Sequence, residues 1–143
     1  MTRTSPELRR LAERLLGYEA DAGEAGAEGA AAAFRVGKKF RNALAPILGS
    51  SGFRTLLMRA LTLARSEAPE LMAVHVRADG SLEGSIKPGL QSGAGQVAEA
   101  EVILIGRLVG LLVDFLGEEL VMSLMFEAWP KDAFRGLKGT SGG

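Results

Sequence analysis

Apolar residues are densest between residues 102 and 113, which read VILIGRLVGLLV with Arg107 as the only charge. A helix that is apolar nearly all round must be covered nearly all round, by other helices, another subunit or lipid. The run is shorter than the roughly 20 residues that a bilayer needs, and Asp114 follows it closely, which favours a buried helix over a membrane span. We expect one long helix from Gln96 to Trp129, which Gly117 can bend.

Periodic apolar positions predict three shorter helices before the long one. The first begins at Ser5-Pro6-Glu7, where a capping side chain precedes a proline, and it ends at residues 17–20. The second spans residues 31–45, and the third ends before Pro69. The short link at residues 49–52 makes the second and third helices an antiparallel pair. The apolar stripe of the first helix consists of Leu8, Leu11, Ala12, Leu15 and Leu16.

Residues 72–86 alternate apolar and polar positions, which is typical of strands. Asp79-Gly80 lies where a two-residue hairpin turn would be, with Val74 and Val76 on one face of the preceding strand. An isolated hairpin is only marginally stable in water, so this one must pack on a helix or pair with another chain.

These elements predict a mainly α fold, a bundle of four or five helices around one long buried helix with a short β-hairpin insert. Residues 1–19 form an N-terminal helix, and residues 20–30, rich in Ala, Gly and Glu, form a flexible linker. Residues 31–137 make up the helical domain and residues 138–143 a disordered tail. Such a linker leaves two alternatives for the first helix, a detachable arm or a permanent member of the bundle.

Composition limits the classes of function. The chain has 143 residues, with 17 Lys and Arg against 17 Asp and Glu, so net charge gives no bias toward nucleic acid or a membrane surface. It has no cysteine, which excludes disulfides and thiolate chemistry. The N-terminus lacks the apolar core of a signal peptide, so we expect a cytoplasmic protein. His75 is the only histidine, and no catalytic set, metal site or cofactor site can be assembled around it.

Two groups of residues on the predicted long helix are candidate sites. Arg107, Asp114 and Glu118 are spaced seven and four apart, so they share one stripe that could hold a charged ligand. We favour the structural alternative, a solvated edge or ion pairs with the basic side chains of residues 35–41. The second group is a large adaptable surface that suits a partner, although core packing is the stronger alternative. It consists of Met122, Met125, Phe126 and Trp129.

Three segments carry a resemblance: GFRTLLMRALTLARSEAPEL (52–71), VRADGSLEG (76–84) and GLLVDFLGEELVMSLMFEAWP (110–130). Together they resemble a group of small, uncharacterised helical proteins predicted from bacterial genomes. The resemblance implies a bacterial origin and a self-contained domain. It brings no activity and no functional residues.

We therefore expect a non-catalytic interaction, regulatory or adaptor module. Its partners would be a second copy of itself, because so apolar a long helix needs more cover than one chain offers, and an unidentified protein. We expect no nucleic acid, no membrane span and no cofactor. The alternative is a small-molecule sensor or carrier with an apolar pocket along the long helix, where Arg107 holds an anionic group. A small enzyme that uses carboxylates is the third reading.

Overall fold

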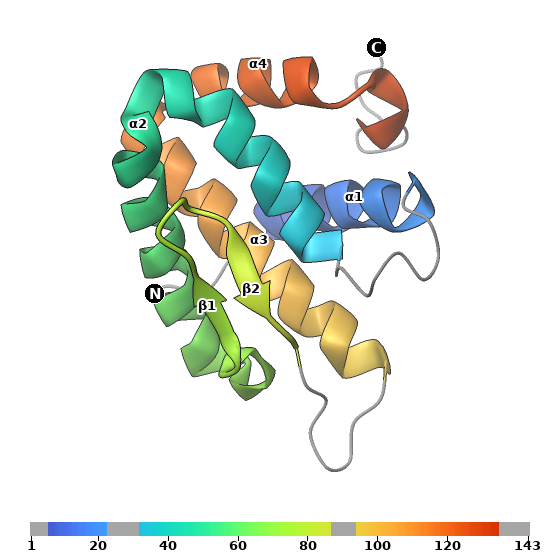
Figure 1. Cartoon of the computed structure of the whole chain (residues 1–143). Coiled ribbons are helices and arrows are strands. Elements are labelled where there is room, and N and C mark those ends of the chain that lie inside the picture. Colours follow the sequence, from blue (N-terminus) through green and yellow to red (C-terminus); the bar gives the residue numbers. More distant parts are fainter. Residues whose placement is uncertain (1–5, 23–31, 87–93, 135–143) are drawn as a thin grey trace.

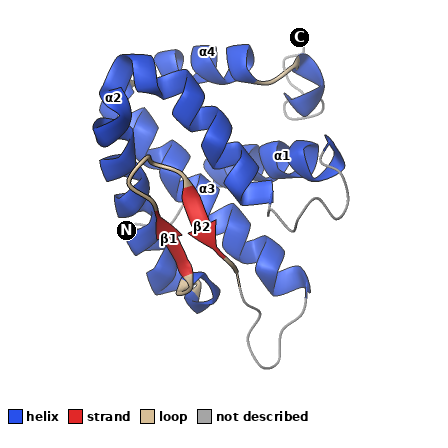
Figure 2. Ribbon diagram, in the orientation of Figure 1, coloured by secondary structure: helices blue, strands red, loops and turns tan. Residues whose placement is uncertain are grey.

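The computed structural model describes residues 6–22, 32–86 and 94–134 (Figure 1). These residues form four α-helices: α1 (Pro6–Ala22), α2 (Ala32–Glu67), α3 (Ala94–Leu116) and α4 (Glu118–Ala128). Two short 3-10 turns, η1 (Pro69–Leu71) and η2 (Lys131–Phe134), accompany one antiparallel hairpin, β1 (Val74–Val76) and β2 (Leu82–Gly84) (Figure 2). The predicted mainly helical bundle with a short hairpin is confirmed.

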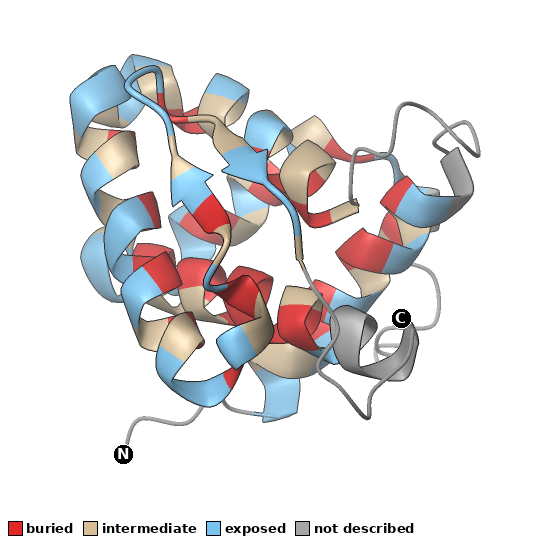
Figure 3. Ribbon diagram, turned by 60° about the horizontal axis from the view of Figure 1, so that its bottom comes forward, coloured by how far each residue is buried: buried red, intermediate tan, exposed pale blue. Residues whose placement is uncertain are grey.

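Helix α3 forms the centre of the hydrophobic core. It packs chiefly against α2 and α1, with further contacts to α4 and η1. Figure 3 shows buried positions gathered where the helices face one another. Within residues 99–116 of α3, the buried apolar residues are Ala100, Val102, Ile103, Leu104, Ile105, Leu108, Val109 and Leu112. The cover that the sequence led us to assign to a second copy is therefore supplied largely within one chain.

The predicted single helix from residue 96 to 129 is wrong, because Gly117 separates α3 from α4. Gly117 has φ 96° and ψ 149°, a backbone conformation that favours glycine. Its N–H donates to the Val113 carbonyl at 2.8 Å, and its own carbonyl accepts from the Val121 N–H at 3.2 Å. Nothing lies within 4 Å of where a Cβ would be, so the backbone angle rather than lack of space requires glycine there.

Helix α2 joins the helix predicted for residues 31–45 to the one predicted between the 49–52 link and Pro69. Gly49, with φ 80° and ψ 157°, is non-helical within it, and Figure 1 shows the chain turning sharply between the two halves. The sequence analysis predicted the position of this turn correctly. It predicted a four-residue link between two helices, whereas the structure has a kink at Gly49 within one helix. With 36 residues, α2 is the longest helix described, and it contacts the other three helices and both strands. It therefore shares the central position that we had assigned to the C-terminal helix alone.

Helix α1 buries most of its predicted apolar stripe: Leu11, Ala12, Leu15 and Leu16. Leu8 packs at the edge of the core against α3, where a Cβ at Gly110 would lie 3.3 Å from Leu8 Cδ1. The helix extends to Ala22, so the first residues of the predicted linker are helical. The remaining linker, from residue 23, and the predicted tail at 138–143 lie outside the described residues.

The hairpin pairs Val74 with Gly84, His75 with Glu83 and Val76 with Leu82. Its loop has three residues, 78–80, instead of the predicted two. Arg77 N–H donates to the Ser81 carbonyl at 2.8 Å, Gly80 N–H donates to the Arg77 carbonyl at 2.9 Å, and Gly80 adopts φ 87°. This is a common three-residue hairpin loop, in which a tight turn is followed by a residue of positive φ, here a glycine. Both strands pack against α2, so of the two predicted possibilities, a helix or another chain, the structure shows the helix.

Candidate interaction site

Helix α4 packs one face on the bundle and turns the other outward. Val121 and Met125 are buried. On the opposite side, successive positions 100° apart bring together five exposed residues: Glu119, Leu120, Ser123, Phe126 and Glu127. The exposed fraction is 39% for Leu120 and 56% for Phe126, and it is 65% for Phe115, just before the Gly117 junction. Three large apolar side chains thus lie in water along one short stretch of chain.

The same stretch is strongly acidic. Residues 108–130 contain four carboxylates and no Lys, Arg or His. Asp114, Glu118, Glu119 and Glu127 are all exposed, and none is ion-paired among the residues that the structure describes. We call the exposed residues of this segment the α4 surface: Asp114, Phe115, Glu118, Glu119, Leu120, Ser123, Phe126 and Glu127.

The helix dipole favours only two of these four carboxylates. Glu118 and Glu119 lie in the first turn of α4, where carboxylates complement the helix dipole. Asp114 and Glu127 lie in the last turns of α3 and α4, where the dipole favours cations, and neither turn contains a basic residue. Each of these two carboxylates is therefore unfavourably placed within its own helix.

The three residues predicted to line a ligand pocket are dispersed. Arg107 forms an ion pair with Glu67 at the end of α2. Asp114 is exposed on α3, and Glu118 belongs to α4 beyond the Gly117 break. The stripe assumed one continuous helix, so the break removes the geometry on which it depended. Within the described residues, Asp114 and Glu118 form no ion pair with the basic residues 35–41, and the pair that does form joins Arg107 to Glu67.

The four residues predicted as a partner surface divide into two pairs. Met125 and Trp129 are core residues, which agrees with the alternative that this group packs in the core. Met122 is half-buried, and Phe126 is exposed with its ring edge-to-face on Phe134, the centroids 4.9 Å apart. Of these four residues, Met122 and Phe126 are accessible to a partner in the folded chain.

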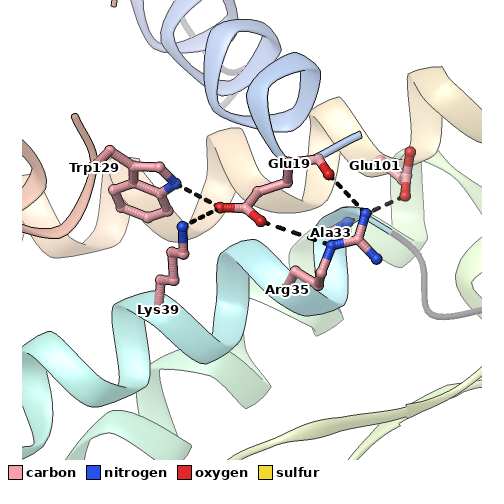
Figure 4. Close-up of polar contacts among 6 residues, drawn as sticks. All are labelled: Glu19, Ala33, Arg35, Lys39, Glu101 and Trp129. Atoms are coloured by element: carbon pink, nitrogen blue, oxygen red, sulfur yellow. Dashed lines mark hydrogen bonds and ion pairs between the residues drawn. The ribbon is translucent and has the colours of Figure 1, made fainter. Parts of the chain in front are cut away.

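A buried charge that the sequence analysis missed joins α1 to the rest of the bundle. Glu19, 3% exposed, is the one charged residue buried in the described ranges. Its carboxylate accepts a hydrogen bond from Trp129 Nε1 at 2.9 Å and pairs with Lys39 Nζ at 2.6 Å (Figure 4). Arg35 Nε lies 3.7 Å from the other carboxylate oxygen of Glu19. Arg35 Nη2 donates a hydrogen bond to the backbone carbonyl of Glu19 at 2.8 Å. We call these four residues the Glu19 cluster.

Aromatic packing surrounds the Glu19 cluster. The Trp129 ring meets Phe40 edge-to-face with centroids 5.1 Å apart. The Lys39 ammonium lies 5.6 Å from the Trp129 ring centroid and 5.4 Å from that of Tyr18. Charge, hydrogen bonds and rings therefore hold together α1, α2 and the residue that follows α4. The arrangement is structural, since the Glu19 carboxylate already has protein partners.

A pocket of about 370 Å³ opens between α1, the start of α2 and α3. Leu16 and Val102 contribute apolar walls, and Glu13, Glu99 and Glu101 contribute carboxylates. Arg9, beside the pocket, pairs with Glu13 and Glu99. Burial raises the pKa of Glu101, and this rise is partly offset by the Ala33 N–H, which donates to it at 3.2 Å, and by Arg35. Arg107 does not line this pocket.

No protein-family model, curated protein or solved structure matches the chain. The resemblance to small bacterial helical proteins stays a prediction. In the described ranges, no group of three or more Asp, Glu or His side chains is placed to hold a metal ion. None of the helices described combines the length and the apolar character that crossing a membrane requires.

One sequence signal could have revealed Glu19. It follows Leu11 and Leu15 at intervals of four, so it continues the apolar stripe of α1 with a carboxylate. A carboxylate in a buried stripe requires a cation or hydrogen-bond donors nearby. The identity of those partners was not predictable, because Trp129 lies 110 positions away along the chain.

Proposed function

We propose that the protein is a non-catalytic interaction module that binds a protein partner through the α4 surface. The observation that carries the proposal is the exposure of Phe115, Leu120 and Phe126 within one segment. Single exposed apolar residues are ordinary, whereas exposed apolar residues that gather mark interaction sites. Aromatic residues are also enriched in protein interfaces. The buried residues of α4 are Val121 and Met125, and of the three exposed side chains Phe126 also contacts the Phe134 ring.

A second copy of the chain stays a predicted partner, although the reason for it has changed. The sequence argument relied on α3 needing cover, and α1 and α2 supply most of that cover. A symmetric dimer through α4 would bring the same patch of both copies together, with Glu119 and Glu127 facing like charges. The other place for a contact between copies is the edge of the hairpin, which the sequence analysis left open to pairing with another chain.

Substitution of Phe126 by serine tests the proposed function. Truncating a central aromatic residue of an interface typically costs about 2 kcal/mol or more, which is a roughly 30-fold loss of affinity. We expect a tagged full-length F126S chain to lose the partner that the wild-type chain retains in extracts of its source cells, as measured by quantitative mass spectrometry.

The matched control is Met58→Ser on α2, where the side chain is also exposed, at 42%. M58S should retain the partner at the wild-type level. Thermal unfolding of both variants shows whether the fold persists. Equal recovery of the same proteins with wild type, F126S and M58S would overturn the proposal.

A small-molecule carrier is the second candidate function, favoured by the pocket between α1 and α3. Its volume of about 370 Å³ falls within the usual range for ligand sites. Arg107 does not line it, so the anion first expected there has no partner; Glu101, which is not paired with Arg9, is the carboxylate left to hold an amine. A small cation retained by the purified protein in native mass spectrometry would favour this reading.

A further inference from the structure

We propose that the α4 surface binds a cationic amphipathic helix, a partner segment in which Lys or Arg residues border an apolar stripe. This inference rests on the proposed function and names the chemistry of its partner. Phe115, Leu120 and Phe126 supply apolar contacts, and the four carboxylates of the α4 surface supply the opposite charge.

Charge complementarity selects a cationic partner. Asp114 and Glu127 lie at helix ends whose dipoles disfavour carboxylates, and all four carboxylates are without an ion pair in the described residues. Lys or Arg side chains of a partner would satisfy Glu119 and Glu127, which lie on the exposed face of α4 with Leu120 and Phe126. Such complementarity speeds encounter and excludes acidic partners.

The backbone of α4 selects a helix as the docking element. Apart from those at its ends, the N–H and C=O groups of α4 bond within the helix, so its exposed face offers side chains and no free strand edge to extend. Leu120 and Phe126 are six positions apart, roughly 9 Å along the axis at 1.5 Å per residue. They also lie about 120° apart around the axis, at opposite edges of the exposed face, so a partner helix that crosses α4 at an angle can contact both side chains.

The like-charge argument also selects against a second copy as the occupant. A two-fold contact would place Glu119 and Glu127 of one protomer near the same residues of its partner, and the exposed face of α4 itself carries no cation. The α4 surface therefore fits a different protein.

The test uses two fluorescein-labelled amphipathic peptides of about 18 residues, five helical turns, identical except that one carries Lys and the other Glu around a Leu stripe. Binding to the full-length protein is followed by fluorescence anisotropy. We expect saturable binding of the Lys peptide, and no saturation with the Glu peptide. We expect the double variant E119Q/E127Q to bind about tenfold more weakly, as for the loss of a charge-assisted contact of about 1.4 kcal/mol.

The matched control is E7Q/E83Q, which removes the same charge from exposed positions on α1 and β2. It should bind the Lys peptide as the wild-type chain does. Equal losses in the two double variants would show non-specific charge attraction and overturn the inference, as would equal binding of both peptides or binding of neither. These outcomes leave the F126S co-purification result untouched, so failure of this inference is distinguishable from failure of the proposed function.

Discussion

Replacing Glu19 by alanine should lower the free energy of unfolding by about 3 kcal/mol. Removal of one partner from a buried ion pair typically costs about 3–5 kcal/mol, and a buried donor left without an acceptor costs about 1–3 kcal/mol. The Trp129 Nε1–H would become such a donor. The Lys39 and Arg35 side chains are 37% and 27% exposed, so water can take over part of their solvation, which places the loss at the lower end. Chemical denaturation measures it.

Glu13→Ala is the matched control for this prediction. Glu13 is also a glutamate of α1, but its side chain is 48% exposed and pairs only with Arg9 one turn away, at 3.4 Å. A surface pair of this kind contributes about 0.3–0.5 kcal/mol. Equal, small effects of E19A and E13A would show that the Glu19 cluster does not stabilise the bundle.

Deletion of residues 1–28 should abolish cooperative folding. Helix α1 buries Leu11, Leu15 and Leu16, and full burial of each leucine contributes about 1.5–3 kcal/mol. With the Glu19 cluster, this total is comparable to the whole stability of a typical domain, about 5–15 kcal/mol. We expect the truncated chain to lose its near-ultraviolet circular dichroism and to bind a hydrophobic dye, with no sharp unfolding transition.

A deletion of residues 1–5 is the control, because it removes no residue of α1. It should unfold cooperatively, as the full chain does. The deletion of residues 1–28 decides between the two alternatives that the linker composition leaves open. A folded, cooperative remainder would make α1 a detachable arm, whereas a molten product makes it a permanent member of the bundle.

Periodicity located the helices because burial of one face leaves a regular mark on the sequence. The stripe of α1 and the dense apolar run of α3 both lie in the core. Breaks within the helices were harder to predict. A glycine inside a helical pattern costs only about 1 kcal/mol relative to alanine, so the sequence permits either continuation or a break. Gly117 ends a helix in the structure, whereas Pro46 is accommodated within one.

Contacts between segments far apart in the sequence account for the other differences between the predicted and the observed structure. Arg107 lay in a stripe with Asp114 and Glu118 only if the helix continued, and its partner, Glu67, lies 40 positions away. The α4 surface was predictable in part. Phe126 was singled out, but the contrast between exposed Phe126 and buried Met125 depends on how α4 turns after Gly117.

Photo-crosslinking in intact source cells tests most directly whether α4 meets a partner. A benzoylphenylalanine replaces Phe126, where the side chain is exposed and aromatic, or Met58 on α2 as the control position. We expect one discrete adduct from position 126 and none from position 58, with the crosslinked protein carrying a basic amphipathic segment at the site of attachment. The absence of an adduct at position 126, or the same adducts from both positions, would contradict the assignment of the α4 surface as the binding site.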